Sequence, residues 1–132
     1  MRWLIFFSCL LIVGKSLSQE FEVLDLSDKL SQNNVNCMIQ DEAGFVWLGT
    51  NDGLNRFDGT HMTEFRYARN DSNCICGNKV LDLTEDDEEN IWIATSSCLN
   101  KLNLADYSFS HYINKVDDPY SISNNSVSLL TS

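Results

Sequence analysis

The chain has 132 residues, of which 43% are apolar and 11% aromatic, with six glycines and one proline. That composition suits one ordered domain and excludes collagen-like and low-complexity chains. The formal charge of −10 repels polyanions, so we expect no contact with nucleic acid, and partners should be neutral or cationic.

The N-terminal segment has the three regions of a secretory signal peptide. Arg2 precedes an unbroken apolar run at residues 3–13, and small residues at 16–18 provide a cleavage site before Gln19. As a helix, that run would rise about 16 Å, which is about half of the hydrocarbon thickness of a bilayer. We therefore expect residues 1–18 to be cleaved and the rest of the chain to be exported.

Four cysteines remain after the signal peptide, and their spacing argues against a metal centre. Cys74 and Cys76 are closer together than a usual zinc-binding pair, and no second pair of Cys or His follows at ligand spacing. We therefore expect neither a metal site nor a cofactor. The four residues are Cys37, Cys74, Cys76 and Cys98.

The rest of the chain contains an internal repeat. Residues 30–59 align with residues 75–104 at an offset of 45. This period is typical of four-stranded propeller blades, and the helical rhythm of about 3.6 residues is missing. Identical pairs include Val35 with Val80, Asp41 with Asp86, Trp47 with Trp92, Thr50 with Thr95, Leu54 with Leu99 and Asn55 with Asn100.

Within the first repeat, short β-prone runs alternate with turn residues. The Asp-Gly pairs are strong hairpin signals, because tight two-residue turns need positive φ angles that glycine adopts without steric cost. Four antiparallel strands per repeat match the composition of a propeller blade. The expected strands are residues 35–40, 45–50, 54–57 and 62–67, with turns at 42–44, 51–53 and 58–59.

The second repeat lacks glycine at three positions where the first has one. We expect backbone strain or a wider loop in its turns, at residues 87–90 and 96–98. Residues 122–127 repeat once more the pattern that precedes each copy, which indicates the start of a third blade. The replaced pairs are Gly44 and Glu89, Gly49 and Ala94, and Gly53 and Cys98.

The expected fold is all-β: a partial β-propeller with two four-stranded antiparallel blades and the start of a third, after a cleavable signal peptide. Closed propellers have about four to eight blades, so the remaining blades of the same propeller are expected partners. The expected segments are the signal peptide (1–18), an N-terminal strand able to close a full propeller (19–29), blade 1 (30–67), an inter-blade loop (68–77), blade 2 (78–112), and a loop with the truncated start of blade 3 (113–132).

Four stretches of the first repeat, residues 33–35, 39–41, 44–50 and 52–59, resemble the two-component regulator propeller repeat. The resemblance implies the N-terminal part of a periplasmic sensor of a hybrid two-component system, anchored in the inner membrane through downstream segments. Such receptors typically form homodimers, recognise oligosaccharides and control polysaccharide use.

The histidine kinase of such a receptor would lie downstream of this chain. His61 and His111 are the only histidines, and neither has a nucleotide-binding glycine motif beside it, so we expect no enzymatic activity here. Two alternatives stay open. The chain is part of a secreted propeller enzyme such as a lyase, or it is a truncated gene product without activity.

Trp47 and Trp92 occupy the same strand position in successive repeats, as packing between neighbouring blades requires. We interpret them as structural residues, with sugar stacking as the alternative. Gly49 and Gly53 are likewise expected to be structural.

Strand direction places the turns between second and third strands on the same propeller face as the connections between blades. A ligand would bind at this face, where Asn51, Asp52 and Arg56 offer the donors and acceptors that sugar hydroxyls need. Good turn chemistry is the alternative explanation for Asp52. The segments on this face are residues 51–53, 68–77, 96–98 and 115–124.

The same face brings Cys98 close to Cys74 and Cys76. A disulfide between Cys98 and one of these two is therefore a candidate, with buried thiols as the alternative. Cys37, early in an inner strand, is expected to be packed as a free thiol.

Overall fold

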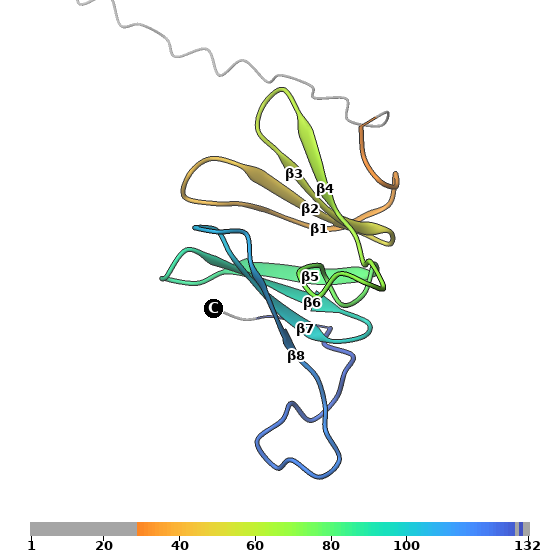
Figure 1. The fold of residues 1–132 in the computed structure, drawn as a ribbon. Coiled ribbons are helices and arrows are strands. Elements are labelled where there is room, and N and C mark those ends of the chain that lie inside the picture. Colours follow the sequence, from red (N-terminus) through yellow and green to blue (C-terminus); the bar gives the residue numbers. More distant parts are fainter. Residues whose placement is uncertain (1–28, 129, 131–132) are drawn as a thin grey trace, which may run out of the picture.

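The computed structural model describes residues 29–128 and 130, which form eight β-strands in two four-stranded antiparallel sheets (Figure 1). Sheet order follows chain order, as in propeller blades. The expected fold class of two four-stranded blades is confirmed. The first blade contains β1 (Val35–Gln40), β2 (Val46–Thr50), β3 (Gly53–Phe57) and β4 (Met62–Phe65); the second contains β5 (Val80–Glu85), β6 (Asn90–Thr95), β7 (Leu99–Asn103) and β8 (Phe109–Tyr112).

The predicted signal peptide and most of the predicted N-terminal strand lie outside the described residues. Within residues 29–128 there is no helix long and apolar enough to cross a membrane. Residues 122–127, the expected start of a third blade, run as irregular backbone, and the amide of Val127 donates to the carbonyl of Thr95 at 3.2 Å.

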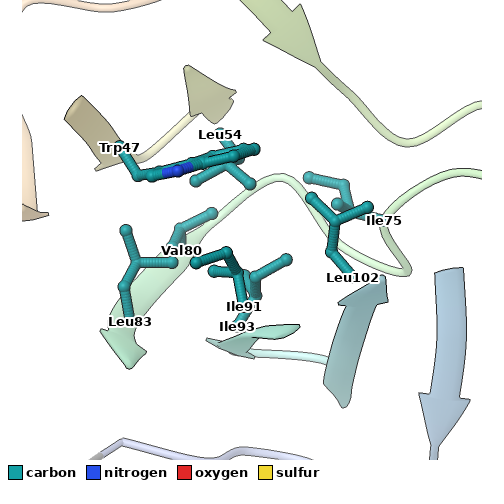
Figure 2. Close-up of a cluster of buried hydrophobic side chains, with 8 residues drawn as sticks. All are labelled: Trp47, Leu54, Ile75, Val80, Leu83, Ile91, Ile93 and Leu102. Carbon is teal, nitrogen blue, oxygen red and sulfur yellow. The ribbon is translucent and has the colours of Figure 1, made fainter. Parts of the chain in front are cut away.

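The hydrophobic core lies between the two blades (Figure 2). Side chains alternate across each strand, so one face of the first blade meets the opposite face of the second. Trp47 and Leu54 reach this seam from the first blade, and both are fully buried. Ile75, from the connection between the blades, closes one side. The second blade contributes Val80, Leu83, Ile91, Ile93 and Leu102.

Gly49, on β2, lies against Val80 of β5, the innermost strand of the second blade. A Cβ atom at Gly49 would stand 2.5 Å from both Cys37 Sγ and Val80 Cγ1. Side chains of any size are therefore excluded, and the seam depends on this glycine. Ala94, at the equivalent position, faces the other side of the second blade.

The glycine-free turn between β5 and β6 keeps the size of its counterpart between β1 and β2. Gly44 has a φ of 94°, and Glu89 takes a φ of 60° at the same position. The closing hydrogen bonds are also the same, from Gly44 to the carbonyl of Asp41 and from Glu89 to that of Asp86. The expected strain is therefore present at Glu89, because a left-handed backbone is costly for a side chain with a Cβ. At residues 96–98 the outcome differs, because Cys98 has no positive φ and β6 and β7 are joined by residues 96–98 where β2 and β3 are joined by 51–52.

Replacing Gly49 with alanine should destabilise the seam. The added methyl group must displace Cys37 or Val80, and overpacking of this kind costs about 1–3 kcal/mol. Urea unfolding followed by tryptophan fluorescence measures the loss. Gly44→Asn is the control, because a Cβ there meets no atom within 4 Å and asparagine tolerates positive φ. Equal stability of Gly49→Ala and the wild type would contradict the close packing.

Candidate functional site

Each blade contains a clip between an aspartate and a tryptophan, which is buried in the first blade and partly buried in the second. Asp41 accepts one hydrogen bond from the amide of Phe45 at 2.9 Å and another from Trp47 Nε1 at 2.8 Å. Asp86 repeats the arrangement, with Trp92 Nε1 donating to its carboxylate at 2.8 Å. The aspartate thereby ties the turn before the second strand to the indole of that strand. The sequence analysis did not predict this clip. The match of Asp41 with Asp86 in the repeat alignment was the signal that could have revealed it.

Buried asparagines anchor the chain as it enters each blade. Asn55 and Asn100 are fully buried on β3 and β7. Asn55 Oδ1 accepts the amide of Ser31 at 3.1 Å, and Asn100 Oδ1 accepts the amide of Cys76 at 2.9 Å. The connection from the preceding blade is therefore fixed to the third strand of the next one.

A disulfide joins Cys76 to Cys98, with 6.2 Å between the Cα atoms. It clamps the inter-blade connection to the β6–β7 turn. In the first blade Ser31, the counterpart of Cys76, instead makes a hydrogen bond of 3.0 Å between its hydroxyl and that of Thr50. Of the two pairings that the sequence left open, the structure thus has Cys98 with Cys76.

Two free thiols accompany this disulfide. Cys74 is buried, and its thiol donates to the carbonyl of Asp71 at 3.1 Å. Burial, together with the charge of Asp82, raises the pKa of Cys37 to about 11. Cys37 is therefore a protonated thiol in the seam.

The three predicted ligand-binding residues do not come together. Asn51 and Asp52 form the β2–β3 turn, where Asn51 accepts a hydrogen bond from Asn36 at 2.9 Å and Asp52 pairs with Arg66 at 3.0 Å. Arg56 lies near the other end of β3, one residue before the strand ends. The three residues therefore do not form one ligand site. A joint role of Asn51 and Asp52 in ligand binding stays a prediction.

Arg56 instead links the two blades. Its guanidinium carbon lies 4.8 Å from the ring centroid of Phe45 and 5.0 Å from that of Tyr107 in the second blade. It also donates a hydrogen bond to the hydroxyl of Tyr107. The Arg56 side chain therefore packs between the two blades.

A pocket of about 360 Å³ lies at this same end of the blades. The β1–β2 turn, the β5–β6 turn and the β7–β8 hairpin converge there, on the left in Figure 1. The predicted ligand face is at the opposite end of the strands. Sequence reasoning missed the pocket, because its wall requires a β7–β8 hairpin that is longer than the β3–β4 turn of the first blade. The lining residues are Asp41, Glu42, Ala43, Phe45, Glu85, Glu89, Leu104, Ala105 and Tyr107.

The repeated sheets, clips and anchors define two adjacent blades of a β-propeller. The family model for the two component regulator propeller matches residues 29–52 and 74–97, the segments that contain the two aspartate–tryptophan clips. The chain therefore carries two repeats of the two-component regulator propeller family.

Solved structures with similar folds are extracellular domains. The extracellular domain of BT3049 from B. thetaiotaomicron, classed as a hybrid two component system, is 36% identical, with a TM-score of 0.77 over 84% of this chain and 16% of its own. Two structures of the extracellular domain of BT4673 from B. thetaiotaomicron are 28% and 26% identical, both with a TM-score of 0.54. They cover 66% and 76% of this chain, and 13% and 15% of their own chains.

A curated relative from Formosa agariphila, histidine kinase P4, is 40% identical over 73 residues. The match covers 54% of this chain and only 5% of the kinase. The chain thus spans a small part of the relatives that it matches.

Asp86→Asn should remove a pH-dependent part of the stability. Desolvation raises the pKa of Asp86, but hydrogen bonds from Asn90 and Trp92 outweigh it and lower the pKa to about 2 from 3.8. A carboxylate with a lowered folded-state pKa stabilises the fold above its unfolded pKa, and this contribution is lost as pH falls from 3.8 towards 2. Urea midpoints between pH 7 and pH 2 should therefore decline less steeply in the variant. Asp87→Asn, in the same turn but exposed, is the control; identical pH profiles of the two variants would rule out the clip's role.

Loss of the disulfide should weaken the second blade. Cys76 and Cys98 are 22 residues apart, and closing a loop of that order contributes about 3 kcal/mol. Cys76→Ser should lose about that much in urea unfolding, whereas Cys74→Ser should retain the disulfide. Mass spectrometry of the unreduced chain after alkylation should show label on Cys37 and none on Cys98. Labelling of all four cysteines without a reductant would disprove the pairing.

Proposed function

We propose that this chain is the N-terminal part of the extracytoplasmic sensor propeller of a two-component signalling receptor. The observation that carries this proposal is the 36% identity to the extracellular domain of BT3049 over 84% of the chain. The two matched repeats support it independently. The predicted signal peptide would export the segment to the periplasm, and membrane anchor and kinase would follow in the full-length receptor.

The outer face of the second blade supports a continuation of the propeller. There the ring centroid of Trp92 lies 5.4 Å from that of Tyr112 and 5.6 Å from Lys101 Nζ. In the seam, the ring centroids of Trp47 and Phe65 are likewise 5.7 Å apart. The face therefore repeats the surface that the first blade buries against the second. Tyr112 is 40% exposed. Another blade is the natural partner for this surface.

We propose oligosaccharides as the ligands and control of polysaccharide use as the output. The sensor acts by binding and carries out no chemistry. An oligosaccharide that binds one arrangement of the receptor homodimer better than the other shifts the equilibrium towards the signalling state. The acidic surface of the chain, with its formal charge of −10, favours neutral or cationic ligands.

A glycan panel tests this function on the complete extracytoplasmic region encoded by the gene. We expect saturable binding of at least one oligosaccharide in calorimetry, with the sugar recovered unchanged. Further repeats, a membrane helix and a histidine kinase should follow the codon for Ser132. Cleavage of the bound glycan would instead favour the secreted enzyme. A stop codon directly after Ser132, together with no binding, would leave the inactive fragment.

A further inference from the structure

We propose that the pocket between the two blades binds a small ligand that carries a protonated amine on a sugar ring, that is, an amino sugar. The inference names a ligand class for the proposed sensor and so rests on that function. The pocket volume of about 360 Å³ falls at the lower end of the range of about 300–1,000 Å³ for ligand sites. Both blades contribute walls, so the pocket forms where two complete repeats meet.

The far wall of the pocket comes from an enlarged hairpin. In the first blade, Asp58 and His61 close the β3–β4 turn, whereas Asn103 and Ser108 close the β7–β8 hairpin, which is two residues longer. The extra length brings Leu104, Ala105 and Tyr107 over the β1–β2 turn of the first blade. This wall is therefore a departure from the repeat and is not needed to build a blade.

The apolar part of the pocket is held in place from behind. Phe45 and Tyr107 line it, and the Arg56 guanidinium is held against both rings. Tyr107 also stacks on Phe65, with the centroids 6.3 Å apart and the ring planes 8° from parallel. A wall that is already ordered lowers the entropic cost of binding. Phe45, half-buried at the pocket, provides an apolar surface for one face of a sugar ring.

The polar part of the pocket is made of carboxylates. Asp41 is already engaged in its clip, and Glu85 accepts the amide of Glu42 at 3.2 Å. Among the described residues, the carboxylates of Glu42 and Glu89 have no hydrogen-bond or ion-pair partner. Two exposed carboxylates therefore remain at the rim as hydrogen-bond acceptors for a ligand.

Neighbouring charges make the pocket selective for cations. Desolvation raises the pKa of Glu85, and the charges of Asp41, Glu42 and Glu89 raise it further. No basic side chain is among the lining residues. An ammonium group would relieve this repulsion and donate charge-assisted hydrogen bonds, whereas uronic acids and sulfated sugars would be repelled.

A metal ion fits the pocket less well than an amine. In the described part of the chain, no three acidic, His or Cys side chains are arranged to hold a metal ion. The carboxylates are instead spread along the rim beside an apolar wall. A ligand with separate cationic and apolar parts matches this division.

The test compares glucosamine with N-acetylglucosamine in calorimetry on the full chain. Acetylation removes the positive charge, so we expect glucosamine to bind at least about tenfold more tightly, which corresponds to one charge-assisted hydrogen bond. Glu89→Gln should weaken glucosamine binding by about the same factor. Glu88→Gln, one residue away in the same turn and not part of the pocket, should bind as the wild type does. Glu42→Gln gives a second pocket variant should Glu89→Gln fail to fold.

Absence of glucosamine binding, equal affinity for both sugars, or equal losses in the Glu88 and Glu89 variants would overturn the inference. A complete receptor that binds neutral oligosaccharides while this chain ignores glucosamine would overturn the pocket ligand and leave the sensing function intact. Failure of every glycan on the complete receptor, with glucosamine still bound in the pocket, would reject the sensing function instead.

Discussion

The seam between the two blades is the constraint on which the rest of the structure depends. A single four-stranded sheet has two faces, and it becomes stable only when another sheet covers one of them. Trp47 is fully buried in this seam and is oriented by Asp41, which also closes the turn before β2. Gly49 then lets the innermost strand of the next blade approach closely. Turn, indole and glycine thus act together, which explains why all three belong to one short motif.

The two ends of the strands on either side of this seam differ in how strongly the repeat constrains them. At one end, the buried asparagines and the disulfide between Cys76 and Cys98 fix the connections between blades. At the other end, the clips of Asp41 and Asp86 fix the β1–β2 and β5–β6 turns, whereas the β3–β4 and β7–β8 hairpins differ in length. Arg56 bridges the blades at this second end and holds Tyr107. Variation in hairpin length there changes a pocket without disturbing the core.

The sequence predicted the scaffold well because the scaffold is repeated. Residues that match at an offset of 45, such as Asp41 and Trp47, proved to have the same contacts in both blades. Contacts made by unmatched residues could not be predicted in this way. The position of Arg56 depends on Tyr107, which comes from an insertion, and the choice of Cys76 over Cys74 depends on the path of the connection. A period gives strand order and register, but it carries no information about side chains that meet across a seam.

This contrast suggests how one propeller repeat serves many ligands. Positions that must pack or cap a turn are constrained in every blade, so they carry no specificity. Specificity has to come from positions where neighbouring repeats differ. Phe45 is replaced by Asn90 in the second copy, and the pocket side chain of Tyr107 belongs to the longer hairpin. The pocket is built largely from such unmatched residues, and a receptor with many blades would offer many seams at which small changes of this kind create a site.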